Sequence, residues 1–160
     1  MLFTLRPLPF ILLSMRVLAI DLGAKRIGIA VSDLLGLTVR PLETIRRSSD
    51  EHSIERVREL VHDLDAERVV VGLPLRMDGT VGDAAAAALQ FAERLRGRLE
   101  VQVVTQDERL TSYEAEEMMK ERGVSRSDRR ARSDEFAAMI ILEDYLSTLK
   151  SNNGVNDKRP

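Results

Sequence analysis

Three acidic residues stand at the ends of apolar segments, where a charged side chain is unexpected. Asp21 directly follows the apolar run 17–20, and Glu108 follows the apolar run 101–105. Asp134 stands at the expected start of the last helix, and the positions on its face at 138, 141 and 145 are apolar or aromatic, so this face packs inward. Each carboxylate is therefore tied to the edge of the core, and we expect the three to meet there.

Carboxylates that are gathered in this way repel one another and are costly to remove from water, so they persist where a divalent cation neutralises them. Oxygen ligands without histidine or cysteine favour Mg²⁺ or Mn²⁺ over zinc. The chain has no cysteine, and its two histidines lie on one expected helix with no cluster of partners. Paired ions of this kind activate a water and stabilise the leaving oxygen when a phosphodiester is hydrolysed. We therefore predict a metal-dependent hydrolase in which Asp21, Glu108 and Asp134 are the catalytic and metal-binding residues, with Asp21 bridging.

Each carboxylate also has an ordinary structural explanation. Asp134 could favour a helix N-terminus, Glu108 could pair with a nearby arginine such as Arg109, and Asp21 could be a turn residue before Leu22-Gly23. The prediction depends on the three occurring together at the ends of the expected elements.

Basic residues accompany these carboxylates. The net charge is −2 and aromatic residues make up 4%, so nucleic acid must be bound by local basic patches rather than by the global field or by stacking on many rings. An arginine-rich connector at 122–132 leads to Asp134, and two basic residues follow Asp21. The alternative is a solvated loop. The residues that we predict to grip backbone phosphates are Lys25, Arg26, Arg109, Arg126, Arg129, Arg130 and Arg132.

The elements that must position these residues alternate between strands and helices. Apolar runs at 16–21 and 27–32 around a glycine-containing turn predict a hairpin, and 37–44 predicts a third strand at an edge. Hydrophobic periodicity and composition predict helices at 50–64, 82–96, 111–122 and 133–149 and strands at 68–73 and 100–105. This order predicts an α/β fold with a mixed five-stranded sheet, three antiparallel strands followed by parallel ones, flanked by helices.

The 160 residues are enough for one domain. We expect a single domain at 15–149, a poorly ordered extension at 1–14 and a disordered tail at 150–160. The apolar stretch at 1–14 contains two prolines, has one basic residue and is too short to span a bilayer, and Met15 opens the first strand as a candidate start. We therefore expect no membrane association and a cytoplasmic location, with which the absence of cysteine agrees.

Four blocks of sequence resemble the YqgF-like family of RNase H-fold proteins. They are 19–23 with 25–33, 70–75 with 77–80, 107–112, and 133–134 leading into 137–142. The resemblance covers about residues 15–147, and Arg76 departs from it where asparagine is more usual. It implies an RNase H-like fold, an acidic active site at Asp21, Glu108 and Asp134, and a nuclease that matures the 5′ end of pre-16S rRNA during ribosome biogenesis.

Other functions remain open from the sequence. The same family is also described as resolving Holliday junctions in DNA recombination and repair, which needs the same carboxylates on branched DNA. A resolvase would normally be a two-fold dimer matched to a symmetric junction. A catalytically silent RNA-binding assembly factor would keep the fold without cleavage. The segment 21–23 followed by a hairpin also resembles the phosphate loop of actin-like ATPases, but the chain is too short for the two lobes that those enzymes need.

Overall fold

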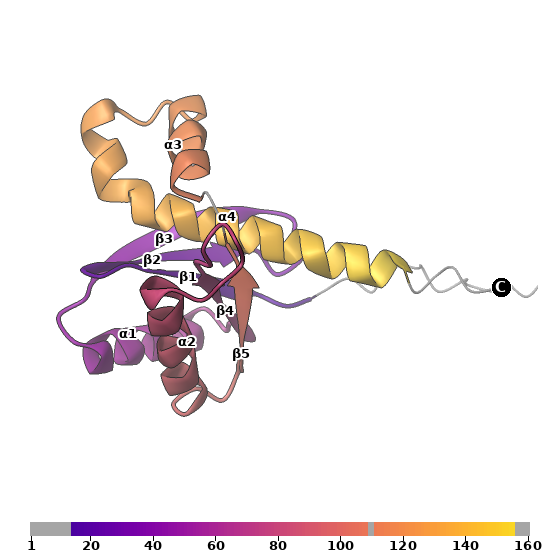
Figure 1. Cartoon of the computed structure of the whole chain (residues 1–160). Coiled ribbons are helices and arrows are strands. Elements are labelled where there is room, and N and C mark those ends of the chain that lie inside the picture. The colour runs from indigo at the N-terminus through magenta and orange to yellow at the C-terminus, as the bar shows by residue number, and fades with distance from the viewer. Residues whose placement is uncertain (1–13, 109–110, 156–160) are drawn as a thin grey trace, which may run out of the picture.

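The structure is a computed structural model that describes residues 14–108 and 111–155. Five strands and four helices follow one another along the chain (Figure 1). In order they are β1 (Val17–Leu22), β2 (Arg26–Ser32), β3 (Val39–Arg46), α1 (Asp50–Asp63), β4 (Arg68–Leu73), α2 (Asp83–Arg96), β5 (Gln102–Asp107), α3 (Thr111–Glu121) and α4 (Arg126–Val155). The predicted order of elements is thus confirmed.

The strands form one mixed sheet in the order β3-β2-β1-β4-β5. The pairs β1–β2 and β2–β3 are antiparallel, whereas β1–β4 and β4–β5 are parallel. A tight turn joins β1 to β2, in which the N–H of Gly23 donates to the carbonyl of Arg26 at 2.9 Å. Parallel neighbours place their carboxyl ends at the same edge, so β1, β4 and β5 all end near the place where Asp21 and Glu108 are found.

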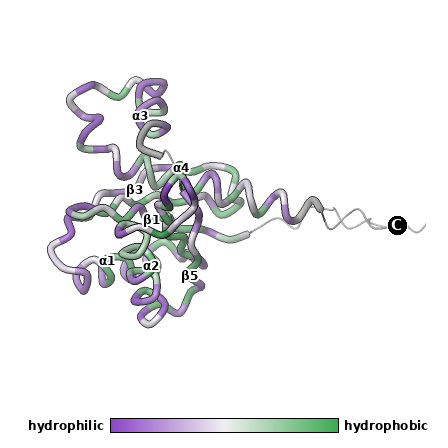
Figure 2. The backbone as a smooth tube through the Cα atoms, viewed as in Figure 1, coloured by the Kyte–Doolittle hydropathy of each residue, from purple (hydrophilic) through white to green (hydrophobic). Residues whose placement is uncertain are grey.

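The two faces of the sheet are covered by different helices. Helices α1 and α2 lie on one face, while α4 crosses the other and α3 stands beyond it (Figure 1). Alternation along β1 sends Leu18 and Ile20 into the core under α1 and α2, and sends Val17 and Ala19 toward α4. Hydrophobic colouring concentrates in the strands and the helix faces against them, and hydrophilic colouring dominates the first turns of α4 (Figure 2).

The last helix differs from its prediction. It begins at Arg126 rather than at 133, so most of the arginine-rich segment is helical and is not a connecting loop. Asp134 consequently lies in the third turn of α4, where it cannot cap the helix N-terminus. The helix also continues to Val155, past the expected boundary at 149. The first two turns of α4 project beyond the sheet and do not pack on the core, so they lack apolar periodicity. The apolar pattern therefore predicted only the part of the helix that packs on the sheet.

Smaller differences concern strand ends. β3 begins two residues later than expected and β5 runs to Asp107, which brings Glu108 immediately after the strand. The predicted N-terminal extension falls outside the described residues except for Ser14. Within the described part of the chain, no helix has the length and apolar character needed to cross a membrane.

Candidate active site

Asp21 lies near the end of β1 on the face that α4 covers. It follows Val17 and Ala19 at strand spacing, and both of these pack beneath α4. Its register partner on β2 is Gly28. The side chain of Asp21 is therefore directed out of the sheet between the first two strands, toward the helix that carries Asp134.

The absence of a side chain at Gly28 lets α4 approach the sheet at this point. A Cβ at Gly28 would lie 1.9 Å from the carbonyl oxygen of Asp134 and 2.7 Å from the amide nitrogen of Glu135. Only glycine permits such a close approach of a strand and a helix backbone. Since Gly28 pairs with Asp21, the contact brings the Asp134 turn of α4 over the end of β1.

Glu108 reaches the same region from β5. Its backbone N–H donates to the carbonyl of Leu73 at 3.0 Å, so the chain stays joined to β4 beyond the strand. A Cβ at Gly72 would meet Glu108 Oε2 at 2.3 Å and Ile141 Cδ1 at 2.5 Å. The Glu108 carboxylate therefore occupies space above β4 that any larger residue at 72 would fill, and only 7% of Glu108 is exposed.

Burial and neighbouring carboxylates make Asp21 difficult to ionise. Removal from water, and secondly the charge of Asp134, raise the pKa of Asp21 from 3.8 to about 7. Among the described residues, none with a basic side chain lowers the pKa of Asp21. A carboxyl group in this state is one that a bound cation would return to its charged form.

Glu108 is also difficult to ionise. Burial is the main cause that raises its pKa from 4.5 to about 8, and the charges of Asp21, Asp144 and Glu114 contribute in that order. Burial also raises the pKa of Asp144. Asp21 is thus coupled to both Asp134 and Glu108 and is the central member of the three.

Asp134 is the carboxylate that has a cationic neighbour. Arg26 Nε lies 2.9 Å from Asp134 Oδ2, in an ion pair of which the two side chains are 46% and 22% exposed. Asp134 Oδ2 is buried and accepts no hydrogen bond. Arg26 therefore contacts it as an ion pair without hydrogen-bond geometry. Asp134 Oδ2 thus has an ion-pair partner but no aligned hydrogen-bond donor.

The three predicted residues converge on one face without enclosing a metal ion. Among the described residues, no three acidic, histidine or cysteine side chains stand close enough to hold one together. Their chemistry does suit Mg²⁺ or Mn²⁺, because the donors are carboxylate oxygens, two of them have raised pKa values, and one has an unbonded buried oxygen.

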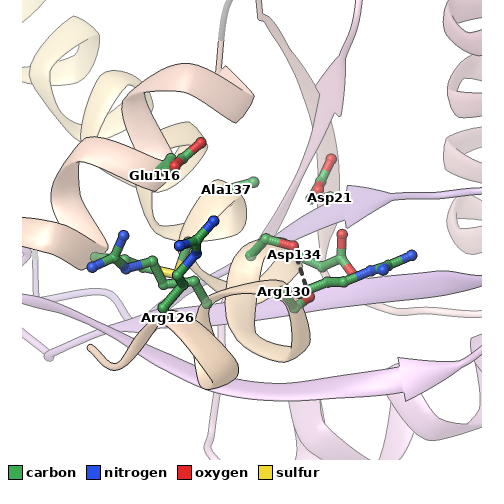
Figure 3. A pocket seen from close by; sticks show the side chains of 9 residues that line it. Asp21, Glu116, Arg126, Arg130, Asp134 and Ala137 are labelled. Atoms are coloured by element: carbon green, nitrogen blue, oxygen red, sulfur yellow. Dashed lines mark hydrogen bonds between the residues drawn. The ribbon is translucent and has the colours of Figure 1, made fainter.

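A cavity of about 420 Å³ opens beside Asp21 and Asp134, between α3 and α4. Three predicted nucleic-acid-binding residues line it, namely Arg126, Arg129 and Arg130, all from the first turns of α4. Figure 3 shows the two aspartates on one side of this hollow and Arg126 on the other. The helical spacing of the arginines, rather than a flexible loop, brings them to one face.

The other predicted basic residues lie elsewhere. Lys25 is exposed on the β1–β2 turn, and Arg26 is exposed as the first residue of β2, where it faces Asp134. Arg132 pairs with Glu135 at 2.8 Å and lies 5.1 Å from the ring of Phe136, outside the lining of the cavity. Arg109 falls outside the described residues.

Two kinds of residue were missed from the sequence. Glu116 and Met119 of α3 line the cavity, but nothing in the sequence indicates that α3 folds against the start of α4. Gly28 and Gly72 shape the site by close approach, and a signal for them exists: each interrupts an apolar strand at a position facing the same side as Asp21.

Comparison with known proteins shows the family of this chain. Residues 15–148 match the family model of RuvX, described as Holliday junction resolvase. The chain belongs to the RuvX family. A relative from Bacillus thuringiensis (strain Al Hakam), named "Putative pre-16S rRNA nuclease", is 41% identical over 136 residues, which cover 84% of this chain and 99% of the relative. A relative of the same name from Bacillus anthracis (strain CDC 684 / NRRL 3495) matches equally well.

Two solved structures of resolvases have a similar fold. RuvC of T. thermophilus in complex with a Holliday junction substrate has a TM-score of 0.55 at 20% identity, covering 84% of this chain and 96% of that one. The fowlpox virus resolvase with its junction DNA has a TM-score of 0.52 at 10% identity, covering 84% and 99%. The predicted RNase H-like fold is confirmed. As a RuvX-family member, the chain is a nuclease, a hydrolase of phosphodiester bonds.

Proposed function

We propose that this RuvX-family nuclease is a metal-dependent endonuclease that matures the 5′ end of pre-16S rRNA in the cytoplasm. The observation that carries the proposal is the convergence of Asp21, Glu108 and Asp134 on one face of the sheet, beside a cavity lined by arginines. The names of the relatives supply the candidate RNA.

In this proposal Asp21, Glu108 and Asp134 hold Mg²⁺ or Mn²⁺. When bound, the metal supplies a nucleophilic water at neutral pH and stabilises charge on the leaving oxygen. Burial of Asp21 and Glu108 keeps the site poor in water, and β1 and β5 hold their carboxylates at a rigid sheet edge. Asp21 would be the ligand placed between the other two, because its charge interacts with both of theirs.

The basic residues of this proposal hold the nucleic-acid backbone. Arg126, Arg129 and Arg130 lie on one side of the aspartates, and Lys25 lies exposed on the β1–β2 turn next to Arg26. Arg26 forms an ion pair with Asp134. Contacts to phosphates fix the position of a strand without selecting its sequence.

Cleavage of a labelled pre-16S rRNA 5′-end fragment, beside a four-way DNA junction, tests the proposal. We expect cleavage of the RNA that needs Mg²⁺ or Mn²⁺ and falls by at least about 100-fold in Asp21→Asn. Asp63→Asn, an exposed change on α1, is the matched control and should cleave normally. Metal-independent cleavage, or full activity of Asp21→Asn, would contradict the assignment.

A second candidate is resolution of Holliday junctions, which the family description favours. It uses the same carboxylates, so only the substrate separates the two. Cleavage of the junction alone, by a dimer with paired cuts related by two-fold symmetry, would support it. Tight RNA binding that Asp21→Asn leaves unchanged, with no cleavage of either substrate, would instead favour a silent assembly factor.

A further inference from the structure

The cavity between α3 and α4 is larger than phosphate contacts alone require. Its volume of about 420 Å³ falls within the range of roughly 300–1,000 Å³ that is typical of pockets for small organic ligands. Backbone phosphates, in contrast, are commonly contacted by side chains and helix ends on open surface. The volume of the cavity beside Asp21 and Asp134 therefore suits a bulkier part of a nucleotide.

The charges of its wall are mixed. Arg126, Arg129 and Arg130 line one side, and no ion pair within the described residues neutralises them, although Arg129 Nε donates to the carbonyl of Val124 at 3.0 Å. Glu116 lines the α3 side (Figure 3). A carboxylate repels phosphate, but it accepts hydrogen bonds from amino groups on base edges. The wall is thus better matched to a base with its adjoining phosphate than to phosphates alone.

The wall also carries groups on which a base can stack. Arg126, Arg129 and Arg130 line the cavity, and arginine planes stack on unpaired bases in RNA recognition. Met119 and Ala137 line it too, but they are only 2% and 6% exposed, so they add little stacking surface. The arginines can therefore accept a flat aromatic ring, although no described residue that lines the cavity is aromatic.

We propose that this cavity receives the base of an unpaired nucleotide adjacent to the scissile phosphate, so that the enzyme cleaves nucleic acid that is single-stranded or locally opened at that position. A base inside a duplex is stacked and paired, and reaches such a pocket only after it is flipped out. The inference rests on the proposed function, since it takes Asp21 and Asp134 as part of the cleavage centre.

A series of short single-stranded RNAs, each with one nucleotide replaced by an abasic one, tests the proposal on the wild-type chain. Binding is measured by fluorescence anisotropy in Ca²⁺, and cleavage is measured in Mg²⁺ or Mn²⁺. We expect one position, next to the cleaved bond, at which loss of the base weakens binding by roughly 5- to 150-fold. Pairing that position with a complementary strand should slow cleavage.

Arg126→Ala separates base recognition from phosphate contact, with Arg58→Ala on α1 as the exposed control. If Arg126 stacks on the base, its removal weakens binding of intact RNA and shrinks the penalty of the abasic position. A phosphate contact would weaken intact and abasic RNA equally. Arg58→Ala should leave both affinities unchanged.

The two proposals fail in different ways. Cleavage without an abasic penalty at any position, or a penalty that Arg126→Ala leaves unchanged, would overturn the base pocket while the nuclease assignment stands. An abasic penalty in binding without cleavage in either metal would support the pocket and overturn the proposed RNA cleavage.

Discussion

At the scale of single residues, the site consists of carboxyl groups that the fold makes unfavourable to ionise. Asp21 and Glu108 have pKa values raised to about 7 and about 8, mainly by burial. A protein without a function for these groups would gain by replacing them with apolar residues of similar size. In the proposed function, the positive charge of a bound metal ion explains their presence at the end of β1 and just beyond β5.

The raised pKa values predict how stability depends on pH. Between about pH 4 and pH 8 the folded chain holds protons on Asp21 and Glu108 that the unfolded chain has released, so the free energy of unfolding falls as pH rises. In EDTA, we expect the Tm of the wild type to fall from about pH 5 to about pH 8.5. The Tm of Asp21→Asn should fall less over this range, and the variant should be more stable than the wild type at the higher pH. Differential scanning calorimetry measures both. Identical pH profiles for wild type and variant would contradict the burial argument.

Substitution of Gly28 and of Gly72 should have different effects. In Gly28→Ala the new methyl group meets the backbone of Asp134, which cannot move without displacing α4 from the sheet, so we expect a loss of about 1–3 kcal/mol in stability. In Gly72→Ala it meets the ends of the Glu108 and Ile141 side chains, which can rotate. We expect a smaller loss of stability there but a large loss of cleavage, because the Glu108 carboxylate is displaced.

Urea unfolding and cleavage rates measure these two effects side by side. Gly97→Ala at the end of α2 is the control, since its Cβ would meet nothing closer than 3.6 Å. A Gly72→Ala enzyme that cleaves normally would show that Glu108 does not act from the position described.

At the scale of elements, the two faces of the sheet are covered by helices with different roles. Helices α1 and α2 cover one face and are joined by surface ion pairs. Arg47 and Arg94 both contact Asp50, at 2.7 Å and 2.9 Å, and Arg94 and Arg98 contact Glu51. Helix α4 covers the other face and carries Asp134 and the arginines of the cavity. The first face supports the sheet, and the second carries the proposed active site.

This division predicts that changes on the α1–α2 face affect stability alone. Asp50→Asn removes one carboxylate shared by two arginines at a partly exposed site, so we expect a loss of about 1 kcal/mol or less. Its kcat and KM for RNA should match those of the wild type. An altered KM would indicate that substrate also contacts this face, and Arg58→Ala would then locate the contact further.

At the scale of the whole molecule, the chain has a net charge of −2, and three of its arginines line one cavity. A general positive field therefore does not drive association with nucleic acid. In the proposed function the contacts are few and local, from Lys25 on the β1–β2 turn and from Arg126, Arg129 and Arg130 on α4.

At most four phosphate contacts, or three if Arg126 stacks on a base, set the salt dependence of binding. For a single strand, each neutralised phosphate contributes about 0.7 to the slope of log K against log salt, so we expect a slope no steeper than about −3. Lys25→Ala should reduce the slope by about 0.7, and Arg58→Ala should not change it. Anisotropy titrations at several salt concentrations measure both. A much steeper slope would mean that further basic residues take part.

The sequence by itself determined the order of the elements, the mixed sheet and the three acidic residues. Local patterns were sufficient for these. Apolar runs and helical periodicity reflect burial directly, and an acid at the end of a buried run is visible without coordinates. The arginines of 126–130 could be named for the same reason, although their segment was expected to be a loop.

Only the tertiary structure decided where these residues meet and what surrounds them. The first turns of α4 are helical without facing the sheet, so they lack the apolar periodicity that would have revealed them. The cavity forms because α3 folds back on α4, which brings Glu116 and Met119 near Asp21 from almost a hundred residues away. The pKa values of Asp21 and Glu108 likewise depend on burial by distant segments. Such long-range contacts depend on packing between elements, which local sequence patterns do not encode.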